Sequence, residues 1–347
     1  MRESGRPLRI GMVAPPWLSI PPDGYGGIES VVATLVDGLV DLGHEVTLFA
    51  AGPHGTKAQH AVRVFDEVAV PGQDGEFPAL LYTALVSAAV ADAGLDLVHE
   101  HTITGLLAAP ARTAPTVHTV HNPVHARFGE YLRRIGDAVS LVALTDYQIE
   151  CAEDLNWVGR VFNAIDTNAF RHVPLKDDYL LYLGRITPEK GVHVAIDAAR
   201  AAGRRIVVAG RCAEPREREY FEQEVGPRLG PGVEWFGHAD FAQKAALLGG
   251  ASGVLCPFQW PEPFCMVIPE ALACGTPVVA LRRGSAAELV VDGYNGYAVD
   301  DAADLPSAIA ALADVDPRDC RRDAEERFGA ERMARAYQDV YRAVLGG

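Results

Sequence analysis

The chain has 347 residues, a length that suits two domains of roughly 170 residues each better than one ordinary core. Apolar residues make up 49% of it and charged residues 22%, which is typical of a folded globular protein and excludes a disordered chain. The formal net charge of −15 disfavours nucleic acid or an anionic membrane as a partner, because both attract basic surfaces. An anionic ligand would therefore need basic residues gathered locally.

No segment reads as a membrane span or a secretory signal. Residues 1–8 lack an apolar stretch, and the longest apolar run, 79–91, is shorter than the roughly 20 residues that a transmembrane helix needs. We interpret this run as a buried helix and expect a cytoplasmic protein. The six cysteines contain no C-x-x-C pair, which indicates reduced, mostly buried thiols rather than a zinc site or disulfides.

Strand-like and helical segments alternate along the first half of the chain. Period-two and continuous apolar runs predict strands at 9–14, 45–50, 95–99, 116–120 and 140–144. Apolar residues at helical spacing predict helices at 29–42 and 79–91. This alternation predicts a doubly wound α/β domain over residues 1–170.

The pattern lapses in a polar segment at 163–178 and then begins again. We predict strands at 180–184, 206–209, 233–236 and 253–256, and helices at 192–202 and 241–248. Residues 171–329 therefore form a second doubly wound domain, and 330–347 a final helix that packs back toward the first. Parallel sheets bind ligands at the carboxyl ends of their strands, so the site is expected in the cleft between the domains.

Two glutamates in one loop–helix–turn–strand segment carry the strongest chemical signal. Pro269 suits the first turn of a helix and Gly275 the position just beyond its end, so Glu270 lies in the first turn. There the helix dipole favours a carboxylate, which can accept hydrogen bonds from the two adjacent hydroxyls of a ribose. Glu262, in the preceding loop, would face the group attached beyond that ribose. A capping glutamate and a surface glutamate are the plain alternative for either residue alone.

Two further segments could hold phosphate. Residues 183–191 follow a strand and open a helix, which brings Arg185, Lys190 and helix N–H groups to one strand end as a pyrophosphate cradle. A solvated turn is the alternative. Gly26 and Gly27 lie between the first strand and its helix, where small residues allow backbone N–H groups to approach an anion, although turns use the same residues.

Histidines gather near the strand ends of the first half. His121 ends a predicted strand and could donate a hydrogen bond to a sugar hydroxyl or to a departing phosphate oxygen. His99 and His101 alternate along a strand and would suit a metal hydrolase, but no further ligands at recognisable spacing follow. Asp314 and Asp316, the one D-x-D pattern of this kind, stand in a polar linker that reads as a solvated turn.

With these residues in place, nearly the whole chain resembles the retaining glycosyltransferases of family four, which have the GT-B fold of two Rossmann-like domains. The segment 257–280 with its paired glutamates carries the resemblance, together with the 184–191 segment, the Gly26–Gly27 loop, His121 and the turn at 163–166. The resemblance implies a hexosyltransferase that uses a nucleoside diphosphate sugar, with UDP favoured, no cofactor and no metal. The first domain would bind a small-molecule or oligosaccharide acceptor and the second the nucleotide.

The resemblance also implies individual roles. Glu270 would bind the ribose, Arg185 and Lys190 the diphosphate, Glu262 and His121 the transferred sugar, and Gly27 a phosphate or sugar oxygen. The donor site would further include Gly26, Gly237, His238, Phe264, Cys265 and Met266. Cys265 departs from the family's usual glycine, which places the choice of donor sugar in question. The Ala-, Gly- and Arg-rich usage and the length resemble actinomycete members that decorate antibiotics of the avilamycin type.

No carboxylate in this set is placed as a double-displacement nucleophile, so the sequence favours front-face transfer, in which the leaving diphosphate takes the acceptor's proton. Three other functions stay open. A nucleotide-sugar epimerase or hydrolase could share the fold, a sugar-nucleotide-binding protein could lack turnover, and an amidohydrolase could use His99 and His101.

Overall fold

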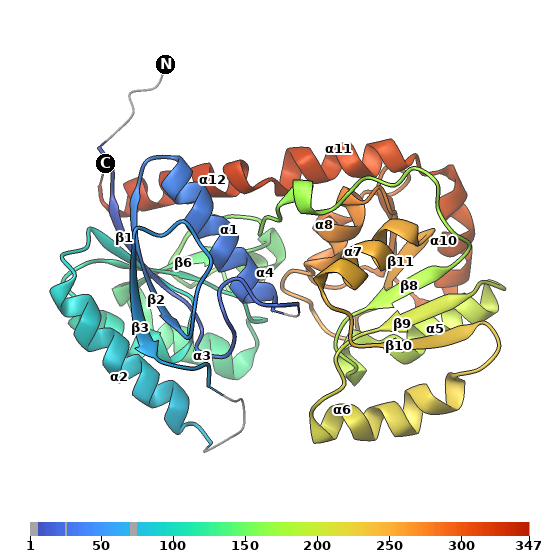
Figure 1. Cartoon of the computed structure of the whole chain (residues 1–347), viewed down its shortest axis with the longest axis horizontal. Coiled ribbons are helices and arrows are strands. Elements are labelled where there is room, and N and C mark those ends of the chain that lie inside the picture. The colour runs from blue at the N-terminus through green and yellow to red at the C-terminus, as the bar shows by residue number, and fades with distance from the viewer. Residues whose placement is uncertain (1–5, 25, 70–74, 347) are drawn as a thin grey trace. The chain divides into compact units, whose positions relative to one another are not determined.

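The computed structural model describes residues 6–24, 26–69 and 75–346, which divide into two compact units (Figure 1). Unit 1 comprises the chain up to Ala164 together with the last helix, from Ala330 onward. Unit 2 is the continuous segment Ile165–Gly329. Each unit contains a parallel sheet with helices packed against it, which confirms the predicted fold class of two doubly wound α/β domains.

The sheet of unit 1 has seven parallel strands in the order β3-β2-β1-β4-β5-β6-β7 within the described residues. Its strands are β1 (Arg9–Val13), β2 (Glu45–Ala51), β3 (His60–Phe65), β4 (Leu97–Glu100), β5 (Thr116–Thr119), β6 (Val139–Ala143) and β7 (Trp157–Arg160). Its α-helices are α1 (Gly27–Asp41), α2 (Phe77–Asp92), α3 (Ala126–Ile135), α4 (Asp146–Glu150) and α12 (Ala330–Val344). The 3-10 helix η1 (Thr104–Ala111) follows β4.

The sheet of unit 2 has six parallel strands in the order β10-β9-β8-β11-β12-β13 within the described residues. They are β8 (Leu180–Leu183), β9 (Ile206–Ala209), β10 (Val233–Gly237), β11 (Gly253–Cys256), β12 (Val278–Leu281) and β13 (Gly296–Val299). Its α-helices are α5 (Val192–Ala201), α6 (Pro215–Tyr220), α7 (Phe241–Gly250), α8 (Val267–Ala273), α9 (Ala286–Leu289), α10 (Leu305–Ala311) and α11 (Pro317–Phe328). In both sheets the strand order reverses beside the first strand, between β1 and β4 and between β8 and β11. Ligands bind preferentially at such reversals.

The final helix α12 lies beside α1, as Figure 1 shows, and forms hydrogen bonds with residues of the sheet of unit 1. A Cβ at Gly38 of α1 would lie 2.8 Å from the Cβ of Ala334, so the two helices approach closely. The hydroxyls of Tyr337 and Tyr341 lie 2.7 Å from Oγ1 of Thr119 and Nδ1 of His99, respectively. The buried face of this helix is thus a packing surface that ends in polar contacts.

The helix expected to be buried at 79–91 is in fact half exposed, and that prediction was wrong. In α2 only Tyr82, Val86 and Val90 are buried, one stripe at a spacing of four residues. Phe77 is 77% exposed, and three leucines of the helix are also exposed. The sequence is apolar on every face of α2, so its hydrophobicity could not show which face meets the sheet.

The end of α8 imposes a strict requirement on Gly275. This residue has φ = +76°, in the left-handed region that glycine favours, and a Cβ there would lie 2.6 Å from the ring of His172 and 3.0 Å from the carbonyl oxygen of Pro317. Gly203, which follows α5, has a similar φ of +67° but open space around its missing Cβ.

We therefore expect Gly275→Ala to lower the free energy of unfolding more than Gly203→Ala. Both variants incur the cost of a left-handed alanine, about 1–2 kcal/mol, whereas only Gly275→Ala also creates a steric clash. Urea unfolding of the two variants and the natural chain measures the difference. An equal decrease in the free energy of unfolding for the two variants would show that the residues around Gly275 can shift to accommodate a Cβ.

Candidate functional site

The strand reversal of unit 2 brings two sequence-distant loops together. Residues 184–191 leave the carboxyl end of β8, and residues 257–266 leave the carboxyl end of the neighbouring β11. Gln259 N donates to the carbonyl oxygen of Glu189 over 2.8 Å, which ties the two loops directly. Gly191 has φ = +74°, and a Cβ there would lie 2.1 Å from the carbonyl oxygen of Pro257. Only glycine therefore permits this approach.

Lys190 and Glu262, predicted separately as phosphate and sugar residues, form an ion pair between these loops. Nζ of Lys190 lies 2.5 Å from Oε2 of Glu262, which also accepts a 2.7 Å hydrogen bond from the Trp260 indole. The ammonium lies over the rings of Trp260 and Phe258, 5.2 and 5.5 Å from their centroids. Glu262 is 5% exposed, so these donors stabilise a buried carboxylate. Trp260 was not singled out from the sequence.

The backbone of Glu262 is fixed by the turn that follows β12. Ser285 N donates to the carbonyl oxygen of Glu262 over 2.8 Å. Gly284 has φ = +58°, and a Cβ there would come within 2.4 Å of that oxygen and 2.5 Å of the amide nitrogen of Glu262. Both the side chain and the main chain of this glutamate are therefore held in place.

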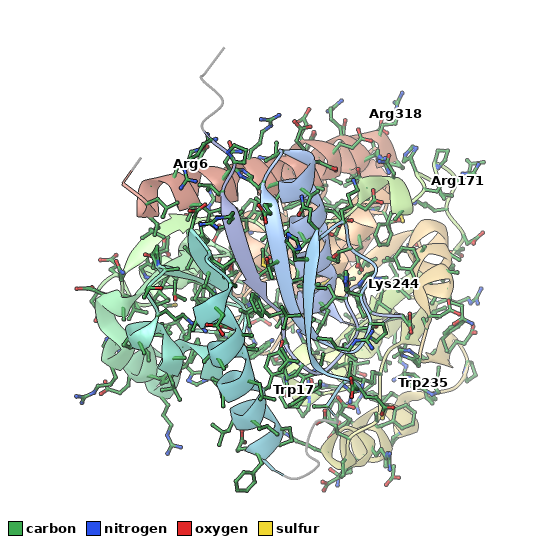
Figure 2. The ribbon with its side chains drawn as sticks, turned by 60° about the vertical axis from the view of Figure 1, so that its left-hand side comes forward. Arg6, Trp17, Arg171, Trp235, Lys244 and Arg318 are labelled. Carbon is green, nitrogen blue, oxygen red and sulfur yellow. The ribbon has the colours of Figure 1, made fainter. Side chains whose placement is uncertain are left out.

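Glu270 lies in the first turn of α8, as predicted, and has a lysine partner that the sequence did not indicate. Its Oε1 accepts from Nζ of Lys244 over 2.6 Å, and both side chains are mostly buried. The ammonium of Lys244, labelled in Figure 2, lies 5.4 and 5.3 Å from the ring centroids of Phe170 and Phe241. Lys244 is on α7, 26 residues before Glu270, and no local motif marks it.

Arg185 stands at the end of β8, on the same segment as Lys190, and it too faces a carboxylate. Its Nη1 is 4.0 Å from Oε1 of Glu217, which is buried. The other carboxylate oxygen of Glu217 accepts hydrogen bonds from backbone N–H groups at the start of α6. Glu217 was not predicted as part of the site. The expected pair of cations is thus present, and each cation has an acidic neighbour.

The remaining predicted donor residues of unit 2 lie at its strand ends and on the loop before α8. Gly237 ends β10 with φ = +87°, and His238 after it is exposed. Phe264 and Cys265 are buried, whereas Met266 is half-buried. A hydrogen bond with Cys265 and, second, burial raise the pKa of the Cys256 thiol well above its usual range. The Cys265 side chain therefore lies against the end of β11.

In unit 1, Gly26 and Gly27 stand where the glycine loop was predicted, at the start of α1. Gly26 has φ = +156° and is buried, and a Cβ there would meet Leu18 and Pro22 within 2.8 Å. Glu29 lies buried in the same first turn, and burial raises the pKa of its carboxyl group. The loop is thus tightly packed around Gly26, whereas Gly27 is exposed.

His121, two residues beyond β5, belongs to a cluster of neutral histidines. Its Nε2 lies 2.9 Å from Nδ1 of His101, and the two rings stack. Both nitrogens of His99 are occupied, one by Tyr341 and the other by Thr119. Burial is the main cause that lowers the pKa of His121 to about 3 and that of His118 to about 4.

Metal ligation is not indicated by these side chains. Among the described residues, no group of three or more His, Cys, Asp or Glu side chains is arranged to hold a metal ion. Asp316 caps the N-terminus of α11 and pairs with Arg318, so it is engaged locally.

Within the same described ranges, no helix has the length and apolar character needed to cross a membrane.

The histidine cluster predicts a loss of stability in acid. The unfolded chain binds protons on its histidines near pH 6.5, whereas His118 and His121 resist protonation in the folded protein until about pH 4 and 3. The unfolded state binds more protons in this window, so the free energy of unfolding falls as the pH falls. Each histidine contributes a slope of at most about 1.4 kcal/mol per pH unit.

Urea unfolding between pH 7 and pH 4 measures this slope. We expect His118→Asn to flatten it, while His54→Asn, at an exposed position outside the cluster, leaves it unchanged. A slope that His118→Asn does not alter would show that the cluster is not responsible.

Two family descriptions match consecutive parts of the chain. Glycosyl transferases group 1 matches residues 165–326, and Glycosyltransferase Family 4 matches residues 25–167. The phosphatidyl-myo-inositol mannosyltransferase of Mycolicibacterium smegmatis is 28% identical, over 96% of this chain and 90% of that protein. The glycogen synthase of Mycobacterium tuberculosis is also 28% identical, over 98% of this chain and 96% of its own length.

Solved structures agree with these matches. AviGT4, a glycosyltransferase involved in avilamycin A biosynthesis, has a TM-score of 0.78 and 29% identity, over 98% of this chain and 99% of that one. The sucrose-phosphate synthase of Thermosynechococcus elongatus shares the fold with a TM-score of 0.78 and 20% identity, over 98% and 99% of the two chains. The chain therefore belongs to the group 1, family 4 glycosyltransferases of GT-B fold, which transfer a sugar from a nucleotide sugar.

Proposed function

We propose that the chain is a retaining, metal-independent hexosyltransferase that moves a sugar from a nucleoside diphosphate sugar, with UDP favoured, to a hydroxyl group of the acceptor. One observation carries the proposal. A single strand–loop–helix segment of unit 2 presents two buried carboxylates, Glu262 and Glu270, each paired with its own lysine. A carboxylate suits sugar hydroxyls and a lysine suits phosphate, so the segment offers both kinds of contact.

Glu270 would hold the ribose of the donor. Lys244 occupies one carboxylate oxygen, and no described residue forms a hydrogen bond with Oε2. The free lone pairs can accept from the adjacent ribose hydroxyls while the lysine stays paired with the other oxygen. The backbone at Gly237 and His238 would contact the base.

Arg185 and Lys190 would hold the diphosphate. Both cations lie at the end of β8 and now neutralise Glu217 and Glu262. A diphosphate carries more negative charge than one carboxylate, so it can draw these cations toward itself. Oε2 of Glu262 would then be released to accept a hydroxyl of the transferred sugar. The donor itself would thus rearrange the ion pairs that bind it.

Retention of configuration would follow from front-face transfer. After Lys190 has moved to the diphosphate, Oε2 of Glu262 would keep the hydrogen bond from the Trp260 indole and accept one from a hydroxyl of the sugar, which occupies its lone pairs and makes it a poor nucleophile. In the proposed step, the bond from the anomeric carbon to the phosphate oxygen breaks as the acceptor oxygen bonds to that carbon from the same face. The acceptor's proton passes to the leaving phosphate oxygen. The two cations stabilise the charge that develops there.

The remaining contacts complete the donor site in this proposal. His121 would contact the transferred sugar, and Gly26 and Gly27 would bring backbone N–H groups to a phosphate or sugar oxygen. Phe264, Cys265 and Met266 would line the sugar's surroundings. The acceptor would be a small molecule or an oligosaccharide bound by unit 1. The similarity to AviGT4 supports an antibiotic intermediate as acceptor.

Lys190→Ala should lower kcat by about 10²–10³-fold, because it removes one group that stabilises charge on the leaving diphosphate. Steady-state turnover of the accepted sugar nucleotide measures the effect. Lys57→Ala is the matched control, since the Lys57 side chain forms an exposed ion pair with Asp41 and its loss should leave turnover unchanged. Near-normal turnover of Lys190→Ala would argue against front-face transfer assisted by this lysine.

Glu270→Ala should weaken binding of the free nucleoside diphosphate by about 10–100-fold, the value of one or two hydrogen bonds to a charged group. Calorimetric titration with UDP, GDP and ADP gives the dissociation constants and identifies the base. Glu234→Ala, at an exposed position of β10, serves as the control. An unchanged dissociation constant would remove Glu270 from the nucleotide site.

Incubation with the donor alone separates transfer from the hydrolase and epimerase alternatives. A transferase should release nucleoside diphosphate slowly until an acceptor is added. Rapid release without acceptor, or formation of an epimeric sugar nucleotide, would instead support one of those alternatives.

A further inference from the structure

Three side chains of unit 1 form a line of hydrogen bonds that ends at His121. The sulfur of Met12 lies 3.1 Å from Nε2 of His101, and Nδ1 of His101 lies 2.9 Å from Nε2 of His121. Met12 and His101 are buried, at the strand reversal between β1 and β4. Both nitrogens of His101 are therefore engaged.

The buried end of this line determines where each hydrogen lies. A thioether sulfur carries no hydrogen and can only accept a hydrogen bond. His101 must therefore be protonated at Nε2, because otherwise two lone pairs would face each other in the core. A neutral imidazole has one N–H, so Nδ1 of His101 is an acceptor. Nε2 of His121 must then donate, which leaves a lone pair on Nδ1 of His121.

The surroundings of His101 and His121 keep both rings neutral. Burial is the main cause that lowers the pKa of both His101 and His121, and neighbouring histidines lower each further. The nearby carboxylate of Glu100 accepts from Arg112 and Thr102, so it is already paired. At neutral pH each ring therefore carries a single N–H.

We propose that Met12 and His101 are positioning residues that hold His121 as an acceptor at Nδ1, so that the transferred sugar must present a hydroxyl group to it. No described residue forms a hydrogen bond with that nitrogen, and His121 as a residue is half-buried. The inference rests on the proposed function, in which His121 contacts the sugar.

This tautomer has a consequence for donor choice. A hydroxyl can donate to the lone pair, whereas a deoxygenated carbon, a methyl ether or an ionised carboxylate has no hydrogen to give. It also reverses one expectation from the sequence, because the free nitrogen of His121 would accept a hydrogen bond rather than donate one to a hydroxyl or to a phosphate oxygen.

The first test needs no substrate. Nitrogen-15 NMR of the intact chain at pH 7, with assignment by a His121→Gln variant, distinguishes a protonated ring nitrogen from an unprotonated one. We expect Nε2 of His121 to be protonated and Nδ1 unprotonated. A protonated Nδ1 would overturn the proposal.

The second test removes the buried acceptor with Met12→Leu, a change of similar volume. His101 then loses the group that fixes its tautomer, so the His121 signals should shift toward a mixture of the two tautomers. Met333→Leu, at another buried methionine of unit 1, is the matched control and should leave the signals unchanged. His121 signals that Met12→Leu does not alter would overturn the role of Met12.

Steady-state kinetics then test whether the tautomer of His121 affects recognition of the transferred sugar. The sugar nucleotide that is turned over fastest is compared with its singly deoxygenated analogues. We expect one analogue to lose about 2–10-fold in kcat/KM, the value of one hydrogen bond, and Met12→Leu to reduce that difference. If no deoxygenation affects Met12→Leu and the natural chain differently, the sugar-facing role is wrong. A natural chain that turns over no sugar nucleotide would reject the proposed function, whereas the NMR result would still report the tautomer.

Discussion

The ion pair between Lys190 and Glu262 is the interaction on which the arrangement of the donor segment depends. It joins the loops that follow β8 and β11, the two central strands of unit 2, over 2.5 Å. A buried carboxylate without a partner is costly, so Glu262 requires the lysine and the Trp260 indole beside it. The glycines at 191 and 284 allow the neighbouring backbones to approach closely enough for this to happen.

Glu262 and Glu270 are each paired with a lysine, but the surroundings of the two lysines differ. Lys190 reaches Glu262 from the adjacent loop and lies over Trp260, whereas Lys244 reaches Glu270 from the helix α7 and lies beside two phenylalanine rings that contact each other. In both places aromatic faces and a carboxylate hold a lysine in a mostly buried position. Both lysines are thus in position before a ligand arrives, and in the proposed binding mode Lys190 only has to exchange Glu262 for the diphosphate, which favours recognition of a charged donor.

The sequence predicted much of the fold because the central strands are continuous apolar runs that alternate with amphipathic helices. Predicted and observed bounds coincide at 206–209 and 253–256 and differ by one to three residues at the other predicted elements. The edge strands β3, β7 and β13 were not predicted, since none of them is a fully buried apolar run: β3 has exposed residues, β7 is half-buried throughout and β13 alternates between buried and half-buried residues. Burial of α2 was also misjudged, because its apolar residues occupy every face.

The parts of the candidate site that belong to a local sequence motif could be predicted. The parts that arise from contacts between residues far apart in the sequence could not. Pro269 and Gly275 placed Glu270 in the first turn of a helix, and α8 has that arrangement. Lys244 and the Met12–His101–His121 line depend on residues 20 to 89 positions apart in the sequence, which the sheet topology brings together. Single-sequence patterns carry no information about such pairs.

The path of the chain has a practical consequence for protein engineering. Unit 2 is an uninterrupted insertion within unit 1, and its two ends are neighbours, because Ile165 N donates to the carbonyl oxygen of Phe328 over 2.9 Å. A cassette cut at 164/165 and 329/330 could therefore be exchanged with that of a relative while the tyrosines of α12 stay with their own sheet. Truncation after residue 329 would instead deprive Thr119 and His99 of their tyrosine partners. Hybrid enzymes built from this chain should keep the last helix and the first domain from the same parent.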